Sequence, residues 1–413
     1  MTIWIPEWRI TVGQTIYTNV TDLSLTVGRT DINKQVQAGY ARVNLINPTN
    51  SYFDIDVTDS VTIEVKNSAG VYVYLFGGYV SDFNVGVTAP TTEGFVTQGT
   101  MIVMGSLAKL PKVLFTTSLS LDQDGDQIYT VLKETTGNSW LQVAPSLTWA
   151  TYDPTVEWQD AEVYIGTIDR PGNYDMAARS AFPEDSYSVV AQIAASGLGQ
   201  IFEDNQGRIC YSDSDARTIA LGASGYTVVD SINAVPSTIK NTLQLGKIRN
   251  DVRLAYGAGY AYSVTLQDDV SLALYGRFTE FIQSNIDGAI QAASVAERIL
   301  KLRAFPRESL ESISFRLDNE DLSDADRDDL IGTYFGMPVS FTNLPLNMFN
   351  GQFDGFVEGW TMKASPQRAD ITITASPTEF SMVALQWYAV NASEQWDTIS
   401  PTLTWEQAIG VIA

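Results

Sequence analysis

A short pattern occurs twice in this sequence, once near each end, and it limits the possible folds more than any other feature does. Residues 76–83 read Phe-Gly-Gly-Tyr-Val-Ser-Asp-Phe, and residues 353–360 read Phe-Asp-Gly-Phe-Val-Glu-Gly-Trp. Both place aromatic residues, a glycine and a valine at the same positions. The matched residues are Phe76, Gly78, Tyr79, Val80 and Phe83 in the first copy and Phe353, Gly355, Phe356, Val357 and Trp360 in the second.

Strand-like stretches surround each copy of the pattern. Alternating runs at 61–65 and 339–342 precede the two copies, and runs at 101–105 and 371–375 follow them. Because the order of elements is kept, we predict that the two ends of the chain fold alike, with the glycines at points where a side chain would obstruct crossing or bending strands. The alternative is a chance match between unrelated sheets, each with a glycine at a bulge or a close backbone approach.

The first 115 residues read as about six short strands separated by turn signals, which is typical of a β-barrel or a sandwich. If both ends form equivalent barrels, three chains would make a ring of six similar barrels around a threefold axis. Such a ring suits a place where a sixfold tube meets a threefold tip.

The chain has 413 residues, of which 45% are apolar and 18% charged, so we expect several domains with their own cores. Many aromatic residues favour sheets over helices. Helical spacing occurs at 126–135, 185–196 and 286–303, and 198–212 reads as a hairpin. The predicted fold class is mainly β with a few helices (α+β), with two β-barrel domains flanking smaller mixed domains.

Five segments follow from these patterns. We predict a first barrel domain at 1–116, an irregular or helical insertion at 117–184, a small α+β domain at 185–236, a second barrel domain at 237–392 that includes the helix 286–303, and a C-terminal extension at 393–413.

Charge and residue usage exclude several classes of function. The net charge is −23, with 25 basic against 48 acidic residues, so the chain lacks the basic stripe with which proteins grip phosphates. The sequence contains no histidine, which excludes Ser-His-Asp catalysis and histidine-ligated metals or haem. No nucleotide-binding glycine motif occurs. Carboxylate chemistry, as in glycoside hydrolysis, stays open, but no residue qualifies as catalytic and no cofactor is expected.

The single cysteine, Cys210, lies in an alternating run, and we expect it to pack in the core. The N-terminus has no signal-peptide pattern, and we expect no membrane span.

Two acidic clusters are candidate calcium sites. Residues 122–126 place oxygen ligands on alternate positions, but the glycine comes too early for an EF-hand loop. In the cluster 318–329, Ser323 and Asp324 are better explained as the N-cap and first turn of a helix.

Four segments carry a resemblance to a known family: 75–80, the hairpin 201–211 after a helix, the helix end and strand at 302–313, and 352–360. In these segments the sequence resembles the tail-hub (minor tail or baseplate hub) proteins of tailed phages. The resemblance extends over about residues 8–390.

The resemblance implies a virion structural protein at the tail tip, with two tail-tube-like barrel domains, that assembles as a homotrimer. It further implies that the ring joins the tail tube and distal tail protein to a central fibre or spike. DNA would pass through the ring during ejection without being bound specifically, and a negatively charged protein suits that passage.

Three other functions compete with this one. Trp140, Trp149, Trp158, Trp387, Trp396 and Trp405 could stack on sugars in a carbohydrate-binding receptor module, although core or interface packing explains tryptophans more simply. A hexameric distal tail protein would need one barrel per chain, and the repeat argues against it. A tail-associated hydrolase would depend on an acidic pair that spacing does not identify.

Overall fold

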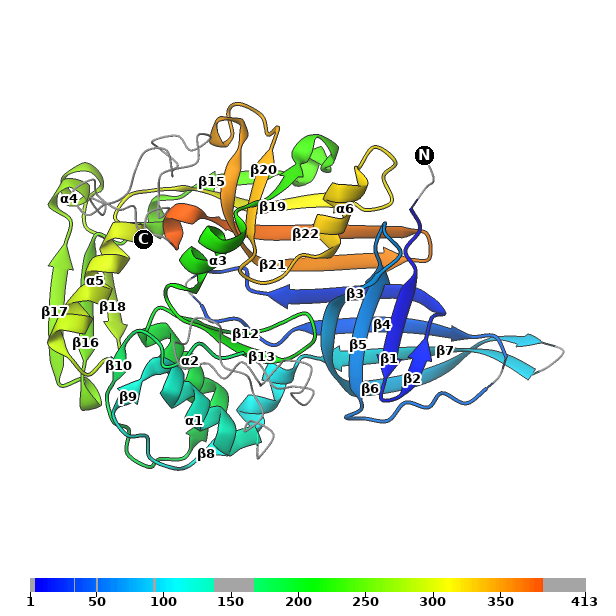
Figure 1. Ribbon diagram of the computed structural model, residues 1–413, viewed down its shortest axis with the longest axis horizontal. Coiled ribbons are helices and arrows are strands. Elements are labelled where there is room, and N and C mark those ends of the chain that lie inside the picture. Colours follow the sequence, from blue (N-terminus) through cyan, green and yellow to red (C-terminus); the bar gives the residue numbers. More distant parts are fainter. Residues whose placement is uncertain (1–3, 33, 50, 92–93, 137–166, 382–413) are drawn as a thin grey trace.

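The computed structural model describes residues 4–32, 34–49, 51–91, 94–136 and 167–381. A 13-stranded sheet runs through the molecule, and helices and small sheets gather on one side of it (Figure 1). The predicted fold class, mainly β with a few helices, is confirmed. Among the described strands the long sheet is open, because its main path runs from β15 (Lys240–Leu243) to β2 (Thr15–Tyr17) without closing on itself.

Strands near the N-terminus form one part of the sheet. Buried apolar residues alternate with less buried polar ones, as in β1, whose Trp8, Ile10 and Val12 are buried. The strands are β1 (Trp8–Val12), β3 (Val20–Gly28), β4 (Tyr40–Asn47), β5 (Ser60–Lys66), β6 (Tyr72–Thr91) and β7 (Gly94–Met104), and we call them the first strand set.

Strands from the second half of the chain form the other part. They are β14 (Thr227–Asp230), β15, β19 (Glu308–Arg316), β20 (Pro338–Thr342), β21 (Phe353–Ser365) and β22 (Arg368–Pro377), and we call them the second strand set. A short helix, α6 (Asp324–Ile331), connects β19 to β20.

The two sets have the same strand order. In the first set it is β1-β5-β6-β7-β4-β3, and in the second it is β14-β20-β21-β22-β19-β15. One difference is that β1 runs antiparallel to β5 whereas β14 runs parallel to β20. The sets are joined edge to edge, because β3 of the first pairs with β21 of the second. Where the sequence predicts two barrels, the described strands therefore form a single continuous sheet.

Smaller elements pack beside the sheet. They are α1 (Asp124–Thr136), α2 (Ser186–Ser196), α3 (Ala216–Ser224), α4 (Asp269–Tyr275) and α5 (Ala289–Arg303), the hairpin β12 (Gln200–Glu203) and β13 (Ile209–Ser212), and a small sheet of β16 (Asp251–Tyr256), β17 (Tyr262–Gln267) and β18 (Thr279–Gln283). Two-stranded pairings link β8 (Leu114–Phe115) with β11 (Glu184–Asp185) and β9 (Asp122–Gln123) with β10 (Asp175–Met176).

Buried apolar residues gather in two main cores. One core contains residues of both strand sets, from Trp8 to Ala375, so the sets share their hydrophobic interior. The other lies among α1, α2, the β12–β13 hairpin, β16 and α5. Within the described residues no helix is long and apolar enough to cross a membrane.

Most of the elements predicted from sequence are present. Helix α2 begins after Asp185, whose side chain accepts a hydrogen bond from the Ser188 N–H, and it ends at Gly197 as the pattern predicts. Cys210 is buried, as predicted. The helix predicted at 286–303 begins only at Ala289, because Gly288 is its N-cap. The alternating run at 101–105 belongs to β7, which ends at Met104, and the chain then enters a 3-10 helix, η1 (Ser106–Lys112).

Candidate functional site: the joint between the strand sets

The two copies of the sequence pattern occupy equivalent positions in their sets. Gly78 of β6 lies opposite Val61 of β5, and Gly355 of β21 lies opposite Val339 of β20. On the other side, Tyr79 lies opposite Met104 of β7, and Phe356 opposite Ser376 of β22. The pattern residues are therefore placed alike with respect to both neighbouring strands.

The equivalence extends to a bulge and to the glycines. In β6 the pairing with β7 shifts between Val80 and Asp82, and in β21 the pairing with β22 shifts between Val357 and Gly359. A Cβ on Gly78 would overlap the carbonyl oxygen of Met104, and a Cβ on Gly355 would overlap that of Ser376. Each glycine thus permits a close approach of strand backbones.

The aromatic and valine residues of the pattern face the interior. Phe76, Tyr79 and Val80 are buried in the first copy, and Phe353, Phe356, Val357 and Trp360 in the second. Phe83 is half-buried, and its ring contacts Phe53 edge-on at 5.4 Å between centroids. Phe353, Val357 and Trp360 belong to the large core, whereas Phe356 packs with Leu221 in a separate cluster.

The joint between the sets depends on two facing glycines. Strands β3 and β21 pair antiparallel from Gly28 opposite Gly359 to Leu23 opposite Ala364. A Cβ on Gly28 would overlap the Glu358 carbonyl oxygen, and one on Gly359 would lie 2.7 Å from the Val27 carbonyl oxygen. Gly28 also has φ +90°, a conformation that glycine adopts at low cost.

A buried carboxylate lies beside this joint. Glu358 is the extra residue of the β21 bulge, and its side chain is 1% exposed. Its oxygens accept hydrogen bonds from Arg29 Nε (2.8 Å), from Arg217 Nη1 (2.7 Å) and Nη2 (3.0 Å), and from Ser376 Oγ (2.5 Å). These donors come from the end of β3, from α3 and from β22. One carboxylate thus connects both strand sets with the helical part of the molecule.

The charges at this site determine how Glu358 ionises. Burial alone would raise the pKa of Glu358, but the positive charges of Arg217 and Arg29 and their hydrogen bonds outweigh it and hold that pKa well below its usual range. The pKa of Arg29 is lowered, chiefly by burial. Glu358 is therefore an anion at neutral pH, paired with two cations.

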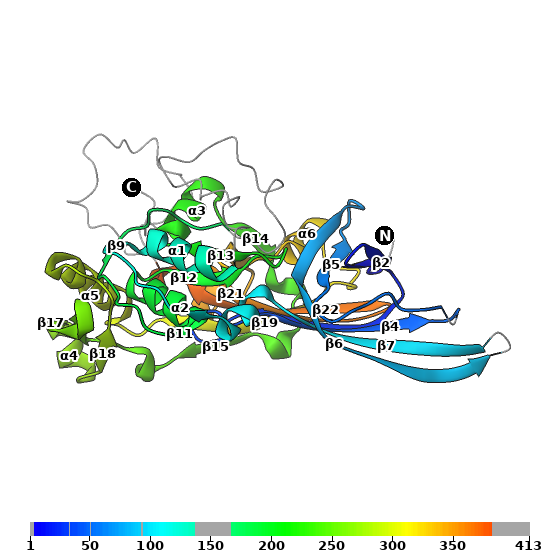
Figure 2. The ribbon, with the colours of Figure 1, turned by 90° about the horizontal axis from the view of Figure 1, so that it is seen from below.

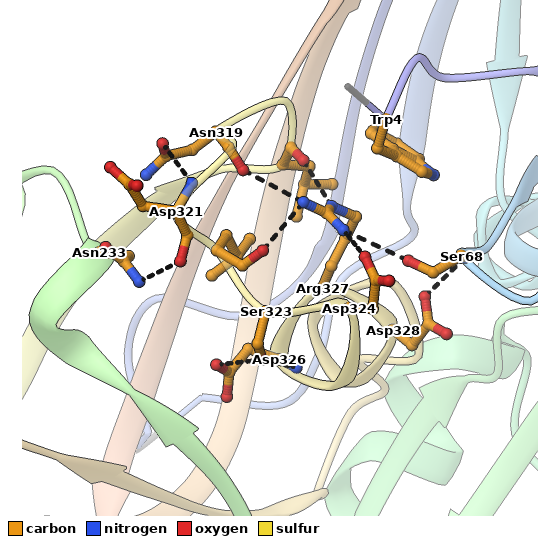
Figure 3. Close-up of polar contacts among 12 residues, drawn as sticks. Trp4, Ser68, Asn233, Asn319, Asp321, Ser323, Asp324, Asp326, Arg327 and Asp328 are labelled. Atoms are coloured by element: carbon orange, nitrogen blue, oxygen red, sulfur yellow. Dashed lines mark hydrogen bonds and ion pairs between the residues drawn. The ribbon is translucent and has the colours of Figure 1, made fainter. Parts of the chain in front are cut away.

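A second contact between the sets involves the loop before α6 (Figure 3). The buried Arg327 guanidinium donates to the carbonyl oxygens of Leu317 (2.8 Å), Asn319 (3.1 Å) and Leu322 (3.0 Å), and it pairs with Asp324. In the first set, the Ser68 N–H donates to Asp328 Oδ1 at 2.8 Å. Helix α6, which carries Arg327 and Asp328, therefore fastens the β5–β6 turn to the second set.

The structure shows what the two acidic clusters do. Ser323 caps α6 by accepting a hydrogen bond from the Asp326 N–H (3.0 Å), as the sequence predicts. The positive charge inside the loop before α6 is the guanidinium of Arg327. In the other cluster, buried Asp124 accepts from the Tyr211 hydroxyl at 2.7 Å, and Asp126 pairs with Arg170 at 2.6 Å. Across the described residues, no group of three or more acidic or cysteine side chains is arranged to hold a metal ion.

All six tryptophans of the carbohydrate-binding alternative lie outside the described residues. The joint residues Arg29, Arg217 and Glu358 were not predicted from sequence. One signal for Glu358 was available, because it is a charged residue inside the strongly apolar run 353–360.

Several strands, among them β2 and β14, have an edge with no strand beside it in the described part of the chain, and two such edges lie at positions equivalent to the joint. The first is β6 from residue 82 onward, which pairs with β7 on one side only and extends with it as a long arm beyond the sheet (Figure 2). On the arm Val85, Val87 and Phe95 are 50–65% exposed. The second is β15, which pairs with β19 on one side only and exposes Leu243. Unpaired edges are places where another chain can add a strand.

Comparison with solved structures shows that the chain shares its fold with tail proteins, one of them from a prophage, as the sequence resemblance predicts. The tail protein from Neisseria meningitidis MC58 superposes with a TM-score of 0.59 at 10% identity, over 92% of this chain and 98% of that one. The 43 kDa tail protein of prophage MuSo2 from Shewanella oneidensis gives 0.54 at 11% identity, over 91% and 99%. No family model and no curated protein matches the sequence.

Proposed function

We propose that this protein is the tail-tip hub of a phage tail, a virion structural protein without enzymatic activity that assembles as a homotrimeric ring. The observation that carries the proposal is the repetition of one six-strand order within a single chain. Two equivalent sets per chain give six in a trimer, so a trimer can present pseudo-sixfold symmetry to a tube. A hexameric distal tail protein needs only one set per chain, and for that reason we favour the hub.

The joint within one chain suggests how neighbouring chains associate. Strand β3 of the first set pairs with β21 of the second. The equivalent of β3 in the second set is β15, and the equivalent of β21 in the first set is β6. Both β15 and the part of β6 beyond residue 82 have an unpaired edge where the corresponding joint would form. We infer that β15 of one copy pairs with β6 of the next, so that the sheet continues around the ring and closes into a barrel.

The register of this contact follows from the joint already present. Ser24 lies opposite Lys363 in the β3–β21 pairing. Gly86 is the equivalent of Lys363, because the alignment of Phe76 with Phe353 continues along both strands to these residues. Lys240 is the equivalent of Ser24, since it lies opposite Ser312 of β19 as Ser24 lies opposite Arg42 of β4. Lys240 of one copy should therefore lie opposite Gly86 of the next. Both positions are exposed, and a Cβ on Gly86 would meet no atom within 4 Å.

Engineered cysteines test this arrangement, since the native Cys210 is buried. The double variant Lys240→Cys, Gly86→Cys should form disulfide-linked trimers under mild oxidation, because paired strands bring Cα atoms within disulfide range. A matched pair, Lys240→Cys with the exposed helical Gly222→Cys, should not. Equal cross-linking of both pairs, or none with the first, would refute the register.

The remaining parts of the proposal concern partners and location. The ring joins the tail tube and distal tail protein to a central fibre or spike, and DNA passes through it without specific binding. The chain has 48 acidic residues and only 25 basic ones, which supports that passage, because an acidic wall does not hold the phosphate backbone. The five domain limits given above belong to this proposal.

A further inference from the structure

A cavity of about 420 Å³ lies next to the joint, between the strand sets and the helical part of the molecule. Five basic side chains line it: Arg29, Lys34, Arg217, Arg298 and Arg303. Only three acidic ones do, namely Asp213, Glu280 and Glu358. The lining of this cavity is therefore basic, in a protein whose net charge is −23.

Several of these charges are already paired. Arg298 binds Asp215 at 2.9 Å, and Glu280 binds Arg249 at 3.1 Å. Neither Asp215 nor Arg249 lines the cavity. Glu358, a single negative charge, is shared between Arg29 and Arg217 and leaves one positive charge in excess.

Arg303 adds a second positive charge. It ends α5, and its guanidinium carbon lies 4.0 Å from the centre of the Phe380 ring. The buried Nη1 atom of Arg303 has no hydrogen-bond partner among the residues that the structure describes. Burial lowers the pKa of Arg303 to about 10, and the charges of Arg29 and Arg217 contribute to this while Glu358 opposes it. A buried N–H donor without an acceptor is costly unless a ligand supplies one.

We propose that this cavity binds a small oxyanion of the phosphate or sulfate type, held by Arg303 together with Arg217 and Arg29. These three arginines outnumber the carboxylates of Glu358 and Asp213 at the cavity. Guanidinium groups suit oxyanions because their N–H donors bind two oxygens at once. The bound anion would fasten α5 to the joint. This inference rests on the cavity and does not depend on the role in the tail.

Inorganic phosphate, added to the full chain after dialysis into phosphate-free buffer, tests the site. Isothermal titration calorimetry should show one phosphate per chain, and thermal unfolding should shift upward with phosphate concentration. Sulfate should act in the same way, whereas acetate at equal ionic strength should not. A response to acetate equal to that to phosphate would overturn the proposal of a site for phosphate-type oxyanions.

Arg303→Met separates binding from stability. The variant keeps an apolar side chain over Phe380 and removes the charge, so without phosphate it should unfold at the same temperature as the native chain or higher. Its affinity for phosphate should be at least tenfold lower than that of the native chain. Arg368→Met, at an exposed arginine paired with Asp370, should keep the response. The proposal fails if native chain and Arg303→Met respond alike, or if neither binds phosphate at millimolar concentration.

Discussion

Gly28 and Gly359 face each other across the joint between the two strand sets, and neither has room for a Cβ atom. Their strands belong to opposite ends of the chain. The backbones approach so closely that the amide nitrogen of Arg29 reaches the Glu358 carbonyl oxygen at 2.7 Å. The continuity of the sheet therefore depends on glycine at these two positions.

Gly28→Ala tests the joint. The new Cβ would overlap the Glu358 carbonyl oxygen at a φ of +90°, so we expect a loss of at least about 2 kcal/mol in the free energy of unfolding, measured with urea. Gly222→Ala is the matched control, because Gly222 lies in α3 with open space around its Cβ position. That substitution should stabilise the protein by up to about 1 kcal/mol. A similar effect of both changes would argue against a tight joint.

Glu358→Gln should be among the most destabilising conservative changes in the chain. It leaves Arg29 and Arg217 buried without their counter-charge, which typically costs about 3–5 kcal/mol. Asp370→Asn serves as the comparison, since it breaks only the exposed pair with Arg368 and should cost less than about 1 kcal/mol. Chemical denaturation at pH 7 measures both.

The same carboxylate gives the stability a dependence on acid. The folded pKa of Glu358 is held well below the ordinary value of 4.5, so its contribution is present in full above pH 4.5 and disappears as pH falls towards the folded value. We expect the native chain to lose stability below pH 4.5 more steeply than Glu358→Gln. Parallel acid-denaturation curves would contradict this assignment.

Glu203 should act with the opposite sign. Its side chain is buried and accepts from the Gly39 N–H (2.8 Å) and the Leu107 N–H (2.5 Å), but burial outweighs these bonds and raises its pKa to about 7. Because the folded pKa exceeds the unfolded value of 4.5, its contribution is largest below pH 4.5 and is lost as pH rises to 7. Between pH 4.5 and pH 7 the free energy of unfolding should therefore fall less steeply in Glu203→Gln than in the native chain. An unchanged slope would exclude Glu203 as the source of this pH dependence.

Sequence reasoning succeeded where a local pattern determines the structure. Alternation predicted β1, capping residues predicted α2, and the paired octapeptides pointed to strands that the structure places in equivalent registers. It missed β14, β15 and α3, which are short. Only Val229 of β14 and Leu221 of α3 are buried, and Leu243, the single apolar residue of β15, is exposed, so none of the three carries a clear apolar pattern.

The joint could not be predicted in the same way. Arg29, Arg217 and Glu358 are far apart in the sequence, and only the pairing of β3 with β21 brings them together. The same pairing explains why the described strands form one open sheet where two barrels were expected. A barrel that closes between copies involves contacts that a single chain does not make.

The exposed arm of β6 and β7 should be needed for assembly but not for folding. Val85→Lys with Val87→Lys places charges at exposed positions, so the unfolding free energy of the isolated chain should change by less than about 0.5 kcal/mol. The trimer should dissociate, since charged residues on an edge oppose strand addition. Phe353→Ala, at a residue only 1% exposed, should instead destabilise the chain by about 3–5 kcal/mol.

The mass of the native particle tests the central claim most directly. Native mass spectrometry over a range of concentrations, on the chain alone and with an isolated tail tube, should show three copies of the 45.3 kDa chain. Images of that particle should show six similar lobes. A sixfold mass, or a chain that stays monomeric at every concentration and also on the tube, would contradict the trimeric hub.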